Sequence, residues 1–339
     1  SNDTDFKGEL STEEALAVLD QLKAARVPAV IFSGGEPLLR PDLPVLLRRA
    51  KALGMHVSVS SNGTLLEAEM AATLADCGVD YYGVSLDGLA PTHDVFRRLE
   101  GAFDAALRGV RLARDSGIKT GIRMTLTEAN ADQLPAVVAL MEAEGLDKFY
   151  LSHFNYAGRG RKHQADDAQH AATRRTLDWL FEHVYARAQA GQAGDFVTGN
   201  NDADGVYLLN WIQHRAPDRV ADMRQRLLNW GGNATGVWVA NIDNLGNVHP
   251  DTMWWQHTLG NVRQRPFADI WADCSDPLMA GLKARPRPLE GRCGRCPSRE
   301  MCNGNTRVRA FATTGNAWAA DPGCYLTDAE VGLLEEVPC

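Results

Sequence analysis

Four of the seven cysteines are spaced like metal ligands, and all four lie near the C-terminal end of the sequence. They form the pattern C-x2-C-x5-C-x21-C and are Cys293, Cys296, Cys302 and Cys324. Four soft thiolates suit either one zinc ion or a [4Fe-4S] cluster, and the spacing alone does not decide between them. Glycines nearby permit tight turns that expose backbone N–H groups to inorganic sulfide, which favours the iron–sulfur cluster. Cys339, the last residue, is an alternative to Cys324 as fourth ligand.

A second candidate site lies where the apolar run 29–32 stops at the segment Ser33-Gly34-Gly35-Glu36-Pro37. Two glycines let the backbone take positive φ and approach a ligand closely. Glu36 can accept hydrogen bonds from an ammonium group, and Pro37 stiffens the exit from the turn. The segment predicts a strand end that holds a small, positively charged group. An ordinary strand-to-helix turn is the alternative.

Short apolar strands alternate with amphipathic helices over the first 150 residues. The predicted strands are 29–33, 56–60, 81–86, 119–126 and 148–152, and the predicted helices are 12–26, 42–53, 67–76, 102–115 and 132–144. This alternation is typical of a parallel sheet with helical crossovers, although it does not separate an open sheet from a barrel. Polar side chains gather at the C-terminal ends of the strands, where parallel α/β folds build their active sites. They are Ser33, Ser60, Ser85, Arg123, Thr125 and Ser152.

The pattern changes after residue 153. A basic loop over 153–162 precedes a helix over 168–189, a turn-rich run over 196–205 and a helix over 217–229. A β-hairpin is predicted from strands 237–242 and 247–250 around a turn at 243–246. We therefore expect three regions: a barrel over 1–165, a helical linking region over 166–235, and a small cysteine-bearing domain over 236–339.

Composition limits the class of protein. The sequence has 339 residues, with 43 acidic and 35 basic side chains and a formal net charge of −8. This charge argues against a general nucleic-acid partner. No apolar run reaches the roughly 20 residues of a membrane span, and the N-terminal residues contain no secretory signal, so we expect no membrane partner and a cytoplasmic location. Cys77 and Cys274 have no partner at ligand spacing; we expect Cys77 in the core and Cys274 as a free thiol.

Four motifs in this order resemble those of a radical S-adenosylmethionine (SAM) enzyme with a SPASM- or Twitch-type extension. They are residues 33–37, 60–63 and 84–88, and the cysteine segment that ends in Asp321-Pro322-Gly323-Cys324. The resemblance implies a partial (β/α)6 TIM-type barrel. It also implies that the glycine-rich strand end binds the amino group of SAM, and that later strand ends hold its carboxylate and ribose. By position, the cofactor-binding residues would be Gly34, Gly35, Glu36, Ser60, Asn62, Ser85, Asp87 and Arg123.

Two departures from the family pattern matter. Such enzymes carry a C-x3-C-x2-C loop, just before the first helix, for the [4Fe-4S] cluster that cleaves SAM. No cysteine precedes Cys77, so we expect the ligands of this radical SAM cluster, and the first strand, upstream of Ser1. Residues 1–339 alone should then not make the 5′-deoxyadenosyl radical. Full SPASM domains hold two auxiliary clusters, but segment 247–255 has no cysteine, so we expect one auxiliary [4Fe-4S] cluster.

Within the family, segments 150–160, 198–205 and 249–255 resemble the tetrapyrrole-tailoring NirJ group of heme d1 biosynthesis, to which the AhbC and AhbD groups are related. The resemblance implies a didecarboxysiroheme-type substrate that loses propionate side chains through the 5′-deoxyadenosyl radical. It also implies a reductant such as flavodoxin or ferredoxin. Basic side chains could bind the substrate's carboxylates and aromatic ones its macrocycle. The candidates are Arg159, Arg161 and Lys162, and Tyr156, Trp238, Trp254 and Trp255.

Other interpretations stay open at this point. His153, His249 and His257 are candidate iron ligands or proton donors, with a structural role as the alternative for each. A peptide-modifying SPASM enzyme would share the same motifs. A non-catalytic zinc- or tetrapyrrole-binding protein would suit the absence of the C-x3-C-x2-C loop. The sequence assigns no catalytic residue.

Overall fold

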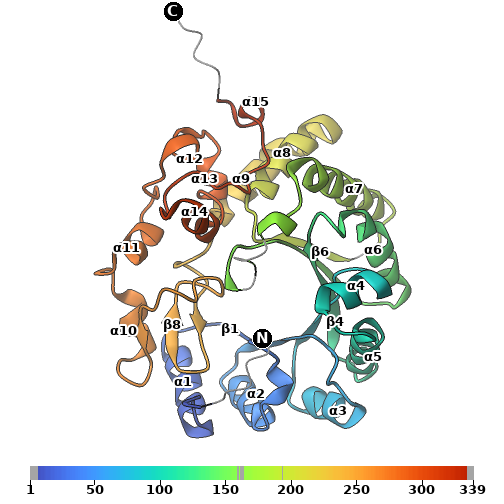
Figure 1. The fold of residues 1–339 in the computed structure, drawn as a ribbon, viewed down its shortest axis with the longest axis vertical. Coiled ribbons are helices and arrows are strands. Elements are labelled where there is room, and N and C mark those ends of the chain that lie inside the picture. The colour runs from blue at the N-terminus through green and yellow to red at the C-terminus, as the bar shows by residue number, and fades with distance from the viewer. Residues whose placement is uncertain (1–6, 159, 161–163, 193, 334–339) are drawn as a thin grey trace, which may run out of the picture.

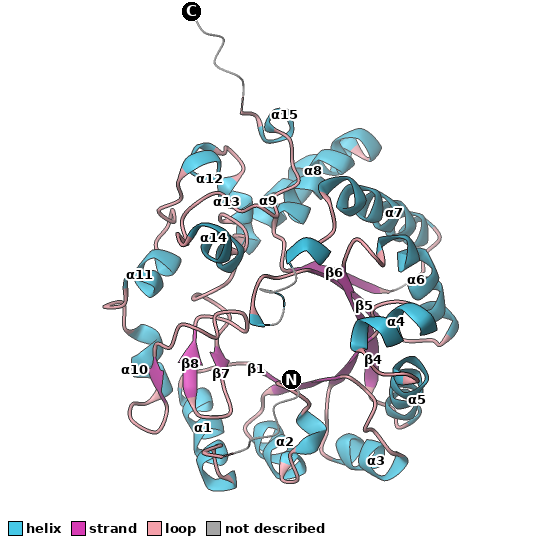
Figure 2. Cartoon of the chain, in the orientation of Figure 1, coloured by secondary structure: helices cyan, strands magenta, loops and turns pink. Residues whose placement is uncertain are grey.

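The computed structural model describes residues 7–158, 160, 164–192 and 194–333. Its main sheet has six parallel strands, each hydrogen-bonded to the next in chain order. They are β1 (Ala29–Phe32), β2 (His56–Ser61), β3 (Tyr81–Ser85), β4 (Lys119–Leu126), β5 (Lys148–His153) and β6 (Asp195–Gly199). The sheet curves into an arc with helices along its outer side (Figures 1 and 2). The predicted partial (β/α)6 barrel is thus confirmed.

Helices cross from one strand to the next over the outside of the arc (Figure 1). They are α1 (Thr12–Ala24), α2 (Leu43–Ala52), α3 (Ala68–Asp76), α4 (Ala90–Arg97), α5 (Ala102–Asp115), α6 (Leu134–Ala143) and α7 (His170–Gln189). A capping box at Ser11, with Glu14 as its acidic partner, begins α1. The core forms where these helices pack on strand residues with no exposed surface, such as Val57, Ile122 and Phe149.

The C-terminal region combines short helices with a small sheet. It contains α8 (Ala203–Arg215), α9 (Val220–Trp230), β7 (Asn241–Ile242), β8 (Asn247–His249), β9 (Gly260–Asn261), α10 (Phe267–Ala272), α11 (Pro277–Lys283), α12 (Gly291–Arg295), α13 (Arg299–Cys302), α14 (Arg307–Thr314) and α15 (Asp328–Val331). The predicted hairpin is present as β7 and β8, and β9 adds a third antiparallel strand. Its first strand is shorter than predicted, because the N–H groups of Val237, Trp238 and Val239 all donate to Ala234 O and close a turn.

The five predicted strands agree with the structure to within one residue. The prediction of turns from residue 196 is wrong, because Asp195–Gly199 pairs in register with Lys148–Ser152 as β6. One strand of the barrel sheet therefore comes from the region 166–235, which we expected to be helical linker. Helices α4 and α8 were not predicted. No helix in the described part of the chain is long and apolar enough to cross a membrane.

Candidate functional site

The first strand end is organised by the Glu36 carboxylate. It accepts a hydrogen bond from Leu38 N (3.2 Å), from Ser61 Oγ (2.7 Å) and from Asn62 N (2.8 Å). These bonds tie the end of β1 to the end of β2 and use three of the roughly four acceptor positions of a carboxylate. Gly34 has φ +121°, and no atom lies within 4 Å of the place where its Cβ would be. The backbone there is exposed, as the motif requires.

Three further predicted residues lie at the same edge, one on each of the next three strands. The Arg123 guanidinium on β4 donates to Ser60 Oγ on β2 and lies 5.1 Å from the centre of the Tyr150 ring. Ser85, the last residue of β3, pairs in register with Arg123. The structure therefore brings Glu36, Ser60, Ser85 and Arg123 to one edge of the sheet.

The side chains of Asp87 and Asn62 already form hydrogen bonds within the protein. Asp87 has no exposed surface, and its carboxylate accepts from Arg97 Nη2 (2.5 Å) and Thr125 N (2.8 Å). The Asn62 side chain accepts from Thr64 N and Thr64 Oγ1 at 2.8 and 2.7 Å. Both side chains thus shape the strand ends. Neither presents a free carboxylate or amide oxygen to the edge.

The four predicted metal-ligating cysteines line a single cavity. They come from α12, the turn after it, the end of α13 and the loop before α15, and are Cys293, Cys296, Cys302 and Cys324. Arg292 Nη1 donates to Cys324 Sγ at 3.3 Å, so a cation lies beside the thiol group. Burial raises the pKa of three of these thiols: Cys296, Cys302 and Cys324. Bound iron or zinc would hold them as thiolates against this shift.

Within the described residues, no three His, Cys, Asp or Glu side chains are grouped as one metal ion would require. Cys77 is buried behind the sheet, where its thiol donates to Pro44 O at 3.6 Å, and Cys274 is exposed. Both agree with the sequence prediction. Cys339 lies outside the described residues.

The predicted substrate residues separate into three groups. Trp254 is only 1% exposed and packs on Val308 and Ala317, so the prediction that it contacts a macrocycle is wrong. Trp238 and Trp255 are 83% and 47% exposed and remain available. The basic side chains of Arg159, Arg161 and Lys162 lie outside the described residues.

The histidines also differ in what they contact. Both ring nitrogens of His249 are engaged, Nδ1 with His257 O (2.8 Å) and Nε2 with Asp243 (3.2 Å). His257 Nε2 lies 2.9 Å from Asp276 Oδ2. These contacts give His249 a structural role and fix His257 on the C-terminal sheet. His153, the last residue of β5, differs because it lines a cavity.

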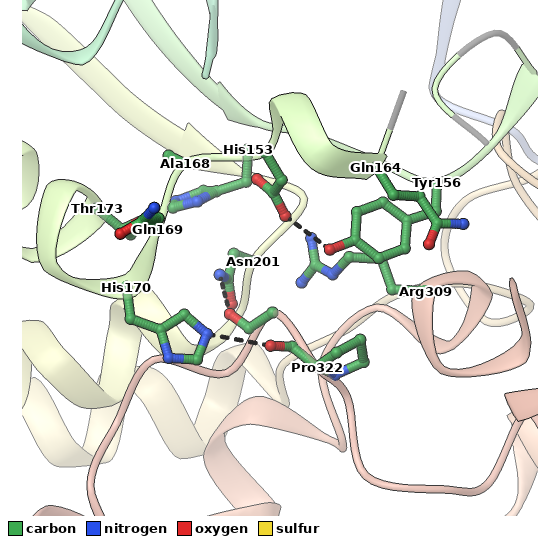
Figure 3. Close-up of a pocket in the computed structure, with 12 residues that line it drawn as sticks. His153, Tyr156, Gln164, Ala168, Gln169, His170, Thr173, Asn201, Arg309 and Pro322 are labelled. Carbon is green, nitrogen blue, oxygen red and sulfur yellow. Dashed lines mark hydrogen bonds between the residues drawn. The ribbon is translucent and has the colours of Figure 1, made fainter. Parts of the chain in front are cut away.

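This cavity, of about 210 Å³, lies between the end of β5, the start of α7 and the turn before Cys324 (Figure 3). His153 Nε2 lies 2.8 Å from Asp204 Oδ2, and the other oxygen of that carboxylate accepts from Tyr325 Oη at 2.8 Å. Tyr156 Oη donates to Asp167 Oδ2 at 3.0 Å across the cavity. Burial raises the pKa of Asp167, which favours its neutral form.

The sequence analysis did not single out Asp167 or Thr173, and it included Asp204 only as part of the segment 198–205 that carries the family resemblance. Each comes from a different segment, and their proximity depends on how α7 and α8 pack. The residues that close the cavity below His153 come from the C-terminal turn, where Arg309 and Asp321 form a buried ion pair. The pattern of charged residues in the sequence does not predict that Arg309 and Asp321 pair beside this cavity.

Three comparisons with known proteins agree with each other. The Radical SAM superfamily matches residues 2–141. The chain is 50% identical to the pre-heme d1 synthase of Dinoroseobacter shibae, over 99% of this chain and 84% of that protein. It is 43% identical to the Fe-coproporphyrin III synthase of Methanosarcina barkeri, over 99% and 85%. Among solved structures, anSMEcpe with bound AdoMet and Kp18Cys peptide superposes with a TM-score of 0.70 and 17% identity, over 92% of this chain and 85% of that one.

Proposed function

The chain belongs to the radical SAM superfamily and is a radical SAM enzyme, and from this premise we propose that it acts in heme d1 biosynthesis. The substrate would be a tetrapyrrole of the didecarboxysiroheme type, from which propionate side chains are removed. One observation carries the proposal: the 50% identity to a pre-heme d1 synthase, which extends over nearly the whole chain. We propose the strand-end edge as the SAM site and the four-cysteine cavity as the site of an auxiliary cluster.

We assign SAM to the edge formed by β1 to β4. The exposed backbone of Gly34 and Gly35 and the carboxylate of Glu36 would bind its ammonium group. Ser60, Ser85 and Arg123 would hold its carboxylate and ribose. Asn62 and Asp87 would contribute indirectly, because their side chains fix the turns that present these groups.

We assign an auxiliary [4Fe-4S] cluster to Cys293, Cys296, Cys302 and Cys324. The four cysteines line one cavity, and a [4Fe-4S] cluster takes four thiolate ligands. Arg292 would offset part of the negative charge of the bound thiolates, because it already donates to Cys324 Sγ. A second [4Fe-4S] cluster, the one that cleaves SAM in this family, would complete the cofactor set.

When bound, the reduced cluster and SAM supply the 5′-deoxyadenosyl radical that abstracts hydrogen from a propionate carbon. The chain's own residues bind and orient: Glu36 and Arg123 fix SAM, and the buried ends of β4 and β5 limit access of water. Trp238 and Trp255 offer exposed rings to the macrocycle. A reductant such as flavodoxin or ferredoxin would deliver the electron. We propose the same division into a barrel, a linking region and a cysteine-bearing domain, with β6 of the linking region completing the barrel sheet.

The test uses the intact protein, reduced without oxygen and supplied with SAM and didecarboxysiroheme. The expected products are 5′-deoxyadenosine and a tetrapyrrole whose mass shows the loss of propionate groups. Iron and acid-labile sulfide should both be present at the C-terminal site. Absence of turnover with this tetrapyrrole would contradict the proposed substrate, and zinc without sulfide would contradict the auxiliary cluster.

Peptide modification is the second candidate, because anSMEcpe shares the fold and was solved with a peptide. At 17% identity this likeness shows the fold alone. The same assay separates the two functions. A peptide-modifying enzyme would leave the tetrapyrrole unchanged and consume SAM only with its peptide.

A further inference from the structure

Two nearly buried polar side chains line the cavity of Figure 3 and keep hydrogen-bonding groups free. The hydroxyl of Thr173, 4% exposed, has no partner among the residues that the structure describes. His153, 5% exposed, uses Nε2 for Asp204, and its Nδ1 has no partner in the same part of the chain. Both groups face the cavity without a partner among the described residues, so they are available to a polar ligand there.

The N-terminus of α7 adds donors of the same kind. This 20-residue helix begins at His170; the side chain of its N-cap residue, Gln169, does not cap it, and the Glu128 carboxylate accepts a hydrogen bond from Gln169 N. Its first backbone N–H groups therefore have no intrahelical partner, and they lie at the positive end of the helix dipole. Gln169, His170 and Thr173 of this first turn all line the cavity. The combination favours an anion.

The charged groups around the cavity carry both signs. Arg309 is matched by Asp321, with Nη2 and Oδ2 2.9 Å apart. Asp167 also lines the cavity, where its carboxyl group accepts from Tyr156 Oη at 3.0 Å, and burial raises its pKa. The nearest fixed carboxylate at the helix start is Glu128, which accepts from Gln169 N at 2.8 Å.

We propose that this cavity is an anion subsite that binds one carboxylate-bearing side chain of the substrate, through Thr173 Oγ, the first-turn N–H groups of α7 and, in the doubly protonated ring, His153 Nδ1. The proposal rests on the proposed function, which supplies a substrate with several carboxylates. At about 210 Å³ the cavity is smaller than the roughly 300–1,000 Å³ of pockets that take a whole ligand, so it takes one arm of a larger molecule.

The position along the sheet supports this assignment. His153 pairs in register with Leu126 of β4, three residues beyond Arg123. The cavity therefore opens from the same edge of the sheet as the SAM-binding strand ends. A substrate arm anchored there would place the rest of the molecule over the centre of the barrel.

The test compares Thr173→Val with Thr176→Val in the intact enzyme. Thr176 is also buried on α7, at 5% exposed, but its hydroxyl donates to Ala172 O (2.9 Å) and does not line the cavity. Binding of didecarboxysiroheme is measured without oxygen from its visible absorbance. Thr173→Val should weaken binding about tenfold, the size expected for one hydrogen bond to a charged group. Thr176→Val should leave it within about twofold.

Two further measurements test whether the cavity binds the carboxylate group of the substrate in particular. The wild-type enzyme should bind the free acid more tightly than its methyl ester, and Thr173→Val should reduce that preference. His153→Gln, which keeps a partner for Asp204 but removes Nδ1, should do the same. Equal affinities of wild type and Thr173→Val for the free acid would overturn the subsite and leave the proposed function standing.

If the wild-type enzyme does not bind the tetrapyrrole, the proposed function is wrong, and sodium propionate alone then decides the subsite. Propionate should raise the unfolding temperature of wild type and Thr176→Val above that in sodium chloride, and should not raise that of Thr173→Val. No response in the wild type would overturn the subsite as well.

Discussion

The buried ion pair between Arg309 and Asp321 should be one of the largest single contributions to stability in the C-terminal region. Their side chains are 1% and 0% exposed, with Nε–Oδ1 at 3.0 Å and Nη2–Oδ2 at 2.9 Å. Arg309 Nη1 also donates to Asn200 O (2.7 Å) and Phe154 O (3.2 Å), which follow β6 and β5. The pair therefore joins α14 and the turn before Cys324 to the barrel.

Replacing Arg309 with Met would leave the Asp321 carboxylate buried without a counter-charge. Loss of one member of such a pair costs about 3–5 kcal/mol of unfolding free energy. With an unfolding entropy of roughly 2.1 cal/mol/K per residue, 339 residues give about 0.7 kcal/mol per kelvin. The melting temperature should therefore fall by about 4–7 °C.

A double-mutant cycle separates the pair from general loss of packing. Asp321→Asn removes the charge and keeps one oxygen acceptor, which can serve either Thr306 N or Gly323 N; these groups now donate to the two different carboxylate oxygens of Asp321, at 3.1 and 2.9 Å. The variant Arg309→Met/Asp321→Asn should be more stable than the sum of the single effects by about 2 kcal/mol. Urea unfolding of the anaerobically purified protein measures all four.

The matched control is Arg226→Met, which breaks an exposed i,i+4 pair with Asp222 on α9. Exposed pairs contribute about 0–1 kcal/mol, so this variant should unfold close to the wild type. The reasoning fails if Arg309→Met costs no more than Arg226→Met, or if the two substitutions in the cycle are additive.

Three other changes test the remaining assignments. Glu36→Gln should weaken SAM binding about 10–100-fold in calorimetry, because it removes the charge that attracts the ammonium group. Cys302→Ser should remove roughly four iron and four sulfide per chain, whereas Cys274→Ser should remove none. Arg174 lowers the pKa of Glu330 to about 2, so this carboxylate stabilises the fold above its unfolded pKa of about 4.5 and less as the pH falls toward 2. Arg174→Met should therefore cost about 1–2 kcal/mol at pH 7, and progressively less in unfolding experiments below pH 4.5.

Local patterns in the sequence were enough to predict most of the barrel. Strands such as His56–Ser61 and Lys119–Leu126 are recognisable because apolar runs end at turn residues. Strand β6 (Asp195–Gly199) was missed because it is short, half-buried and followed by asparagines and aspartates that are typical of turns. Its pairing with β5 is a long-range property.

At the candidate SAM edge, too, local patterns predicted the backbone positions of the residues but not their long-range contacts. The motifs predicted that Glu36, Ser60 and Arg123 lie at one edge, because the ends of neighbouring parallel strands must meet there. They did not predict that the Asp87 carboxylate is already hydrogen-bonded within the protein. Its partner Arg97 lies on α4, a helix that the sequence analysis did not predict. A motif specifies the backbone position of a residue, and the side chain's partners depend on packing.

The cysteine cavity and the proposed anion subsite are connected through residues that contact both of them. Cys324 is followed directly by Tyr325, whose hydroxyl donates to Asp204, and the same carboxylate holds His153. The rings of His153 and Tyr325 also stack, with centroids 6.4 Å apart. In the proposed assignment, the segment that supplies the cluster ligand Cys324 also fixes the His153 imidazole, so assembly of the proposed cluster and shaping of the proposed subsite should be coupled. Loss of the cluster should therefore impair substrate binding even though no cysteine lines the subsite.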